Sequence, residues 1–252
     1  MKLLLDLGNT RLKWAMSDVH GWSARGAVAW EEDVAAVLLA AWKVLGSPLQ
    51  VFGASVVDAT REAQLETAVK EVFACDIAWV RTPAEACGVR NAYAEPQRLG
   101  VDRFLAMVAA HAAGHAPCVL AGIGTALTLD ALTADGQHVG GLIAPGPLLM
   151  QQSLLGATAR VRPEHPGVIR NVADNTADAV VSGCWHAVAA LVERFAKNIA
   201  SEHPGGAQRL LLDGGDADAL LPLLGVPAQV AADSVLRGLL VWADSHPPSG
   251  AL

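Results

Sequence analysis

The chain has 252 residues, of which 52% are hydrophobic, and it carries a formal net charge of −7 at pH 7. This length allows one large domain or two smaller ones, and it is sufficient to bury a full hydrophobic core. An acidic chain without clusters of Lys and Arg is a poor candidate for direct binding to nucleic acid, so we expect no such partner.

The chain shows no sign of export or of insertion into a membrane. Its four cysteines are widely spaced and form no metal-ligand pattern, so free thiols in a reducing cytoplasm are expected. The apolar run at residues 3–5 is too short for a signal peptide. Residues 104–129 lack charged side chains, but glycines and Pro117 interrupt them. A buried helix followed by a buried strand explains this stretch better than a membrane span.

The first predicted element is a strand–turn–strand unit at the N-terminus. Residues 3–5 predict a buried strand, and Gly8-Asn9 predicts a tight turn with positive φ. After the turn, Leu12, Trp14 and Met16 alternate with more polar residues, which is strand periodicity.

Several residues of this hairpin suit the binding of a phosphate group. The turn offers backbone N–H groups and the side chains of Asn9 and Thr10 to an anion, and Lys13 adds a cation. Asp6 is a hard oxygen ligand that suits Mg²⁺. A Walker loop would instead lead from a strand into a helix. The alternative is a surface hairpin with ordinary turn residues.

Helices and strands alternate between this hairpin and residue 113. The patterns predict helices at 31–45, 61–73 and 99–113, strands at 50–57 and 77–80, and an irregular segment at 83–97. Asp58 is a plausible N-cap for the second of these helices.

The start of the helix at 99–113 is a second candidate site. Asp102 could act as a general base and Arg103 as a substrate clamp, and Gly100 would let the backbone approach a ligand. Alternatively, Asp102 is a simple helix cap that the helix dipole favours, and Arg103 is its salt-bridge partner. Tyr93 is the only tyrosine of the chain and is weak evidence by itself.

A second strand–turn–strand pattern follows at residues 118–131. Residues 118–121 are apolar, residues 122–125 form a small-residue turn, and apolar residues then alternate along the next strand. Aligning Gly8 with Gly124 places Thr125 on Asn9 and Gly122 on Asp6. The two halves could therefore be related and grip one nucleotide between them, although chance similarity of two hydrophobic hairpins is the alternative.

The remaining patterns support a mixed fold with a duplicated core. They predict a turn at 134–136, a loop at 156–166, helices at 177–199 and 233–242, a strand at 210–212, and a frayed tail at 245–252. Asn175-Thr176 could cap the long helix. Gly214-Gly215 could accommodate a flat base, or it could be a plain strand-to-helix turn.

Together these motifs resemble the type III pantothenate kinases, a family that includes proteins labelled Bvg accessory factor. The matching pieces are residues 6–10, Tyr93, residues 99–103, Gly124-Thr125-Ala126 with Thr128 and Asp130, residues 140–146, Asn175-Thr176, and residues 214–217. The resemblance implies an α/β fold of two ribonuclease H-like lobes, as in the acetate and sugar kinase/Hsc70/actin superfamily. We place these lobes at residues 1–115 and 116–252.

The resemblance also implies the reaction, which is ATP-dependent phosphorylation of pantothenate to 4′-phosphopantothenate in the first step of coenzyme A synthesis. It implies a homodimer. The composition, as described above, leads us to expect a cytoplasmic location and no membrane or nucleic-acid partner. Asp102 would be the catalytic base, and Asp6 would lie near Mg²⁺. The ATP-binding residues implied are Asp6, Leu7, Gly8, Asn9, Thr10, Arg11, Leu12, Lys13 and Thr125. The pantothenate-binding residues implied are Tyr93, Gly100, Val101, Asp102, Arg103 and Thr176.

The chain departs from the family at Gly122. Many members have an Asp at this position, two residues before the Gly-Thr-Ala turn, where it binds a monovalent cation. We therefore expect no requirement for K⁺ or NH₄⁺ through that ligand set. Two alternatives stay open: an accessory protein that keeps the kinase fold, and a phosphotransferase of the same superfamily with another acceptor.

Overall fold

The structure is a computed structural model, and it describes residues 1–203 and 209–246. The chain divides into two compact units, Met1–Gly114 with the segment from Ser234 onward, and His115–Asp233. Each unit contains one five-stranded sheet, with the strand orders β3-β2-β1-β4-β5 and β10-β9-β8-β11-β12. Three strands form an antiparallel meander in each sheet, and the other two pair in parallel with its first strand and with each other. The mixed α/β architecture and the duplicated core are confirmed.

The first unit begins with the predicted hairpin. Its strands are β1 (Lys2–Leu7), β2 (Arg11–Asp18), β3 (Gly21–Ala29), β4 (Gln50–Ser55), β5 (Ile77–Val80), β6 (Glu85–Ala86) and β7 (Val89–Arg90). Its helices are α1 (Val34–Trp42), α2 (Ala59–Phe73), the 3₁₀ turn Pro96–Arg98, α3 (Val101–Ala112) and α7 (Ser234–Ser245). Asp58 caps α2 as predicted, accepting hydrogen bonds from the backbone N–H groups of Thr60 and Arg61.

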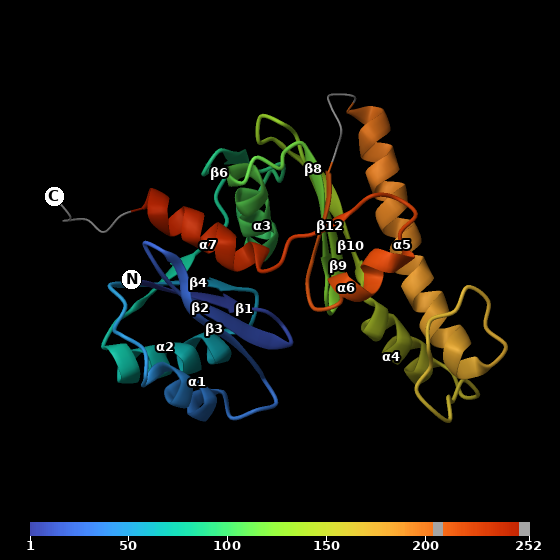
Figure 1. Cartoon of the computed structure of the whole chain (residues 1–252), viewed down its shortest axis with the longest axis horizontal. Helices are drawn as coiled ribbons and strands as arrows, with labels where there is room; N and C mark the ends of the chain where they lie inside the picture. Colours follow the sequence, from blue (N-terminus) through green and yellow to red (C-terminus); the bar gives the residue numbers. More distant parts are fainter. Residues whose placement is uncertain (204–208, 247–252) are drawn as a thin grey trace. The chain divides into compact units, whose positions relative to one another are not determined.

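Helices cover both faces of the first sheet, because its central strands are apolar on both sides (Figure 1). One face packs against α1 and α2, with Leu3, Leu5 and Leu7 of β1 in this core. The other face packs against α3 and α7, and Leu4 of β1 lies in that core.

The C-terminal helix α7 differs from the predicted division of the chain. We assigned it to the lobe at 116–252, but the structure places it in the first unit. The backbone explains the placement, because Gly238 of α7 lies against Leu105 of α3, where an added Cβ would clash with the Leu105 carbonyl. Leu236 and Leu239 are buried in the same cluster as Leu105.

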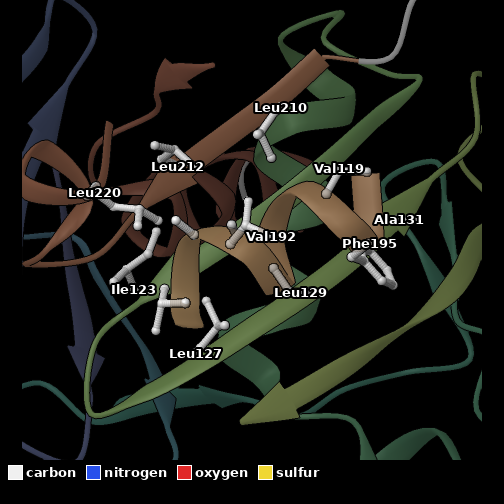
Figure 2. Close-up of a cluster of buried hydrophobic side chains, with 14 of the residues drawn as sticks. Val119, Ile123, Leu127, Leu129, Ala131, Val192, Phe195, Leu210, Leu212 and Leu220 are labelled. Carbon is white, nitrogen blue, oxygen red and sulfur yellow. The ribbon is translucent and has the colours of Figure 1, made fainter. Parts of the chain in front are cut away.

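The second unit repeats the strand order of the first. Its elements are β8 (Cys118–Ile123), β9 (Ala126–Leu132), β10 (His138–Pro145), α4 (Pro147–Ala157), α5 (Thr176–Glu202), β11 (Arg209–Asp213), α6 (Ala217–Leu220), the 3₁₀ turn Leu221–Leu223 and β12 (Gln229–Val230). Figure 2 shows its core, in which Val192 and Phe195 of α5 pack against side chains of the strands, including Leu129.

Two segments differ from their predicted form. Helix α4 was not predicted and extends into the segment 156–166, which was expected to be a loop. Pro147 at its first turn is the only residue of α4 that is buried, so α4 buries no continuous apolar stripe. Of the tail predicted at 245–252, residues 247–252 lie outside the described part of the chain.

The long helix α5 is the one described helix whose length and composition would allow it to cross a membrane. Val188, Val192 and Phe195 on one side of it are buried in the core of the second unit. The uncharged stretch 104–129 is divided between α3, β8 and β9, which confirms a buried helix followed by a buried strand.

Candidate active site

Asp6 and Lys13 lie opposite one another in the first hairpin, where β1 and β2 pair. Side chains alternate along a strand, so Asp6 shares the face of Leu4 and Lys13 shares the face of Ala15. Leu4 and Ala15 belong to the core that packs against α3 and α7. Both charged side chains are half-buried. The hairpin therefore presents a carboxylate and an ammonium group on the sheet face that α3 covers.

The turn of this hairpin has a different backbone from the predicted one. The Gly8 N–H donates to the Arg11 carbonyl at 3.1 Å, which closes the turn around Asn9 and Thr10. The predicted positive φ is wrong, since neither Gly8 nor Asn9 adopts it. Gly8 instead permits a close approach, because an added Cβ would lie 3.3 Å from the Arg11 carbonyl oxygen. Asn9 and Thr10 are exposed at the tip.

Asp102 lies in the first turn of α3, which is a helix of the same unit. Its Oδ1 accepts a hydrogen bond from the Arg103 N–H at 2.8 Å. An added Cβ at Gly100 would lie 2.5 Å from that oxygen, so glycine leaves space for the carboxylate. The N-cap residue Gly100 offers no side-chain hydrogen bond. Asp102 thus contributes to the start of the helix, as the capping interpretation expected, and its side chain is half-buried rather than enclosed.

Arg103 and Tyr93 form a pair beside Asp102. Arg103 is only 6% exposed, although it is charged. Its Nη1 donates to the Tyr93 hydroxyl at 3.2 Å, and its guanidinium carbon lies 5.9 Å from the centre of the Tyr93 ring. The structure therefore brings Tyr93 to Arg103, which lies ten residues further along the chain and directly follows Asp102.

Asn91 holds the segment that carries Tyr93, and sequence reasoning did not identify it. Its Oδ1 accepts from the Tyr93 N–H at 2.9 Å. Its Nδ2 donates to the carbonyls of Pro83 and Pro96, at 3.3 and 3.1 Å. The only signal in the sequence was an amide side chain between two prolines of an irregular segment.

The second hairpin has a shorter turn than the first. The Gly124 N–H donates to the Ala126 carbonyl at 3.1 Å, and Thr125 is exposed at the tip. The Gly146 N–H donates to the Thr125 carbonyl at 2.9 Å, and an added Cβ at Gly146 would clash with the Gly124 carbonyl. The glycine-rich motif at 140–146 thus ends against the turn that carries Thr125.

Gly214 supports the same region from β11. Its φ of +104° favours glycine, and an added Cβ would clash with the Ile123 carbonyl at the end of β8. The Asp216 N–H donates to that carbonyl at 3.3 Å. Close packing of backbone therefore accounts for Gly214.

Thr176 is exposed at the first residue of α5, in the second unit, whereas Tyr93, Asp102 and Arg103 belong to the first. Asn175 is the N-cap of α5, and its Oδ1 accepts from the Asp178 N–H at 3.0 Å. The Asp178 carboxylate accepts from the Val168 N–H at 2.8 Å, and this bond lowers the pKa of Asp178.

Gly122 lies opposite Thr128 in the pairing of β8 with β9. An added Cβ at Gly122 would lie 2.6 Å from the Thr128 hydroxyl oxygen. A larger residue at this position would therefore displace Thr128.

The described residues include no cluster of three or more His, Cys, Asp or Glu side chains that could hold a metal ion. A single half-buried carboxylate such as Asp6 suits Mg²⁺, which is commonly bound by one or two carboxylates together with substrate phosphates. A cavity of about 800 Å³ lies between α1 and α2. None of the predicted site residues lines it.

Comparison with known proteins identifies the family. Residues 2–198 match the family model described as type III pantothenate kinase. The chain belongs to this family. It is 42% identical to a type III pantothenate kinase of Aromatoleum aromaticum over 96% of this chain and 98% of the relative. It is also 42% identical to that of Xanthomonas campestris pv. campestris (strain B100), over 95% of this chain and 96% of the relative.

Solved structures with low sequence identity share the fold. A Campylobacter jejuni structure assigned to the Baf family of transcriptional activators has a TM-score of 0.61 at 17% identity, covering 96% of this chain and 98% of the other. A Sinorhizobium meliloti structure named for 2-dehydro-3-deoxygalactonokinase also has a TM-score of 0.61, at 14% identity, covering 97% and 99%. These likenesses confirm the predicted fold. Membership of the family confirms the predicted phosphorylation of pantothenate, which leads to coenzyme A.

Proposed function

We propose that Asp102 is the general base of this pantothenate kinase and takes the proton of the attacking pantothenate hydroxyl. One observation carries this proposal: a half-buried carboxylate lies beside the Tyr93–Arg103 pair, at the start of a helix that packs on the sheet face of Asp6 and Lys13. A base in such a position typically contributes about 100-fold or more to the rate.

Tyr93 and Arg103 would bind pantothenate, and Gly100, Val101 and Thr176 are the other residues proposed to bind it. Pantothenate carries a carboxylate, and a guanidinium group with little access to water binds carboxylates strongly. Burial of Arg103 and its bond to Tyr93 support this assignment, because they fix the direction of the guanidinium group before substrate arrives.

The first hairpin would hold the ATP phosphates. Phosphoryl transfer needs positioning and charge neutralisation more than covalent chemistry. Lys13 would neutralise phosphate charge, and Leu7 and Leu12 would hold the turn from the core. The turn from Gly8 to Arg11 would approach the phosphates with backbone N–H groups such as that of Asn9, since the Gly8 N–H already donates to the Arg11 carbonyl. Thr125 is the remaining residue proposed to contact ATP. Asp6 would hold Mg²⁺, which when bound neutralises charge on the transferring phosphate.

We further propose a cytoplasmic homodimer that has no membrane or nucleic-acid partner and needs no monovalent cation. The net charge of −7 disfavours contact with nucleic acid. Residue 122 is a glycine, and a side chain there would collide with the Thr128 hydroxyl. This crowding supports the proposal that no monovalent cation is bound through a carboxylate at residue 122.

ADP release and product mass spectrometry, with and without pantothenate, test the activity, and Asp102→Asn tests the base. We expect pantothenate-dependent release by the wild type and a kcat about 100-fold lower in the variant, with an unchanged fold. Asp33→Asn is the matched control, since Asp33 only caps α1 by accepting from the Ala36 N–H. Near wild-type turnover by Asp102→Asn would return Asp102 to a capping role. Ligand binding without any turnover by the wild type would favour an accessory protein.

A further inference from the structure

The three carbonyl groups of the first hairpin turn are all occupied by two residues from elsewhere in the unit. The Trp30 indole Nε1 donates to the Gly8 carbonyl at 2.7 Å, and the Trp30 backbone N–H donates to the Thr10 carbonyl at 3.2 Å. Arg61 donates from Nη1 to the Asn9 carbonyl at 3.3 Å. Along the chain, Trp30 is 22 residues from Gly8, and Arg61 is 52 residues from Asn9.

Trp30 and Arg61 also contact each other. The Arg61 guanidinium carbon lies 4.7 Å from the centre of the Trp30 ring, which is a favourable cation–π distance. Arg61 is fixed at its backbone too, because its N–H donates to Asp58, the N-cap of α2. Both side chains are half-buried. The pair is therefore a rigid support rather than two independent surface side chains.

This support has a direct consequence for anion binding. A carbonyl oxygen that faces a phosphate repels it, whereas an N–H group attracts it. Because Trp30 and Arg61 donate to all three carbonyl groups of the turn, these oxygens are engaged by donors of the protein itself and not directed at a bound anion. Arg61 also brings a positive charge to the turn without being among the predicted ATP-binding residues.

We propose that Trp30 and Arg61 are positioning residues that hold the Gly8–Thr10 turn in its phosphate-binding conformation. This inference rests on the proposed role of the turn in ATP binding. The competing interpretation is purely structural, because both residues also line the cavity between α1 and α2. A structural role alone would lower the stability of the protein without changing its affinity for ATP selectively.

The test uses Trp30→Phe, which keeps an aromatic ring beside Arg61 and removes the indole N–H, and Arg61→Gln. Trp79→Phe is the matched control, since the Trp79 indole donates to Glu66 at 2.7 Å and Arg81 lies 5.8 Å from its ring centre. We measure the Kd of a non-hydrolysable ATP analogue, the KM of each substrate and the thermal midpoint. A lost hydrogen bond is worth about 0.5–1.5 kcal/mol, so we expect ATP affinity to fall about 3- to 10-fold.

The KM for pantothenate should stay within about twofold, Trp79→Phe should resemble the wild type, and Arg61→Lys should recover part of the affinity. Unchanged ATP affinity in both variants, while Asp6→Asn and Lys13→Met weaken it, would overturn the inference and leave the phosphate site in place. Unchanged affinity in all four variants would remove the turn from the ATP site altogether. If Trp30→Phe and Trp79→Phe lost the same ATP affinity and both had lower thermal midpoints, the role of Trp30 would be structural only.

Discussion

The two hairpins that open the two sheets share a place in the fold and differ in chemistry. β1–β2 and β8–β9 each supply the centre of a sheet with the same strand order. The first places Asp6 opposite Lys13, whereas the second places Gly122 opposite Thr128. The two hairpins thus share their pairing of strands, while charge is present at one pair and absent from the other.

The two turns are also supported in different ways. Side chains hold the first turn, through Trp30 and Arg61. Backbone holds the second, through the approach of Gly146 and Gly214 to residues 123–125. Shortening a supporting side chain should lower the stability of the first turn only modestly. In the second turn, the close backbone contacts leave no space for even one added carbon atom. The two hairpins should therefore respond differently to substitution.

The largest expected difference concerns charge. Asp6→Asn should lower kcat/KM by about 100-fold or more, because it removes the carboxylate that would hold Mg²⁺ beside the phosphates. Thr125→Ala in the second hairpin should lower kcat/KM by only about 10-fold, since it removes a neutral hydrogen-bonding group. Steady-state kinetics at saturating Mg²⁺ measures both. Comparable losses in the two variants would contradict the assignment of charge to the first hairpin.

The next difference concerns stability. Gly146→Ala should lower the free energy of unfolding by about 2–3 kcal/mol, because its Cβ would clash with the Gly124 carbonyl and the turn must move. Gly8→Ala should cost less than about 1 kcal/mol, since its Cβ would lie 3.3 Å from the Arg11 carbonyl oxygen and its φ is not positive. Denaturant midpoints measure both values. Equal costs would show that the two turns are supported alike.

Local patterns in the sequence predicted many of the elements, although not α4, but they did not predict the contacts between elements. Strand β5 matches its predicted range of 77–80, and Asp58 caps α2 as expected, because both depend on neighbouring residues. An amphipathic helix does not specify which sheet it covers, so α7 was assigned to the wrong unit. That choice depends on its packing against α3, more than 120 residues away in the chain.

The candidate site shows the same limit. The hairpin and Asp102 were recognisable from their motifs, but the reason for Gly8 was not, because a glycine can serve a close approach or a positive φ. Trp30, Arg61 and Asn91 bond to backbone carbonyl or N–H groups, which do not depend on the side chain of the partner residue. No pattern of side chains identifies such a partner, and only the folded backbone brings the two groups together.

The thiols extend the comparison between the two units. Cys118 and Cys184 of the second unit are buried, whereas Cys75 and Cys87 of the first are half-buried. Burial raises the pKa of Cys118 to about 12 and also raises that of Cys184. Since the thiolate is the reactive form, a disulfide reagent at pH 8 should modify the two thiols of the first unit rapidly and those of the second only after unfolding. Peptide mass spectrometry identifies the modified residues, and rapid labelling of Cys118 in the native protein would contradict this assignment.

The smallest expected effect is the response to monovalent cations. With no carboxylate at residue 122 and the Thr128 hydroxyl beside it, the second hairpin lacks the ligand by which many family members bind such a cation. Turnover should therefore stay within about twofold when K⁺ or NH₄⁺ replaces Na⁺ at constant ionic strength, because the bulk screening of charge is then unchanged. Gly122→Asp should not create a K⁺ response by itself, because its side chain would first have to displace Thr128. Strong activation of the wild type by K⁺ would mean that the second hairpin recruits charge through other oxygen atoms, and the contrast between a charged and an uncharged hairpin would then be lost.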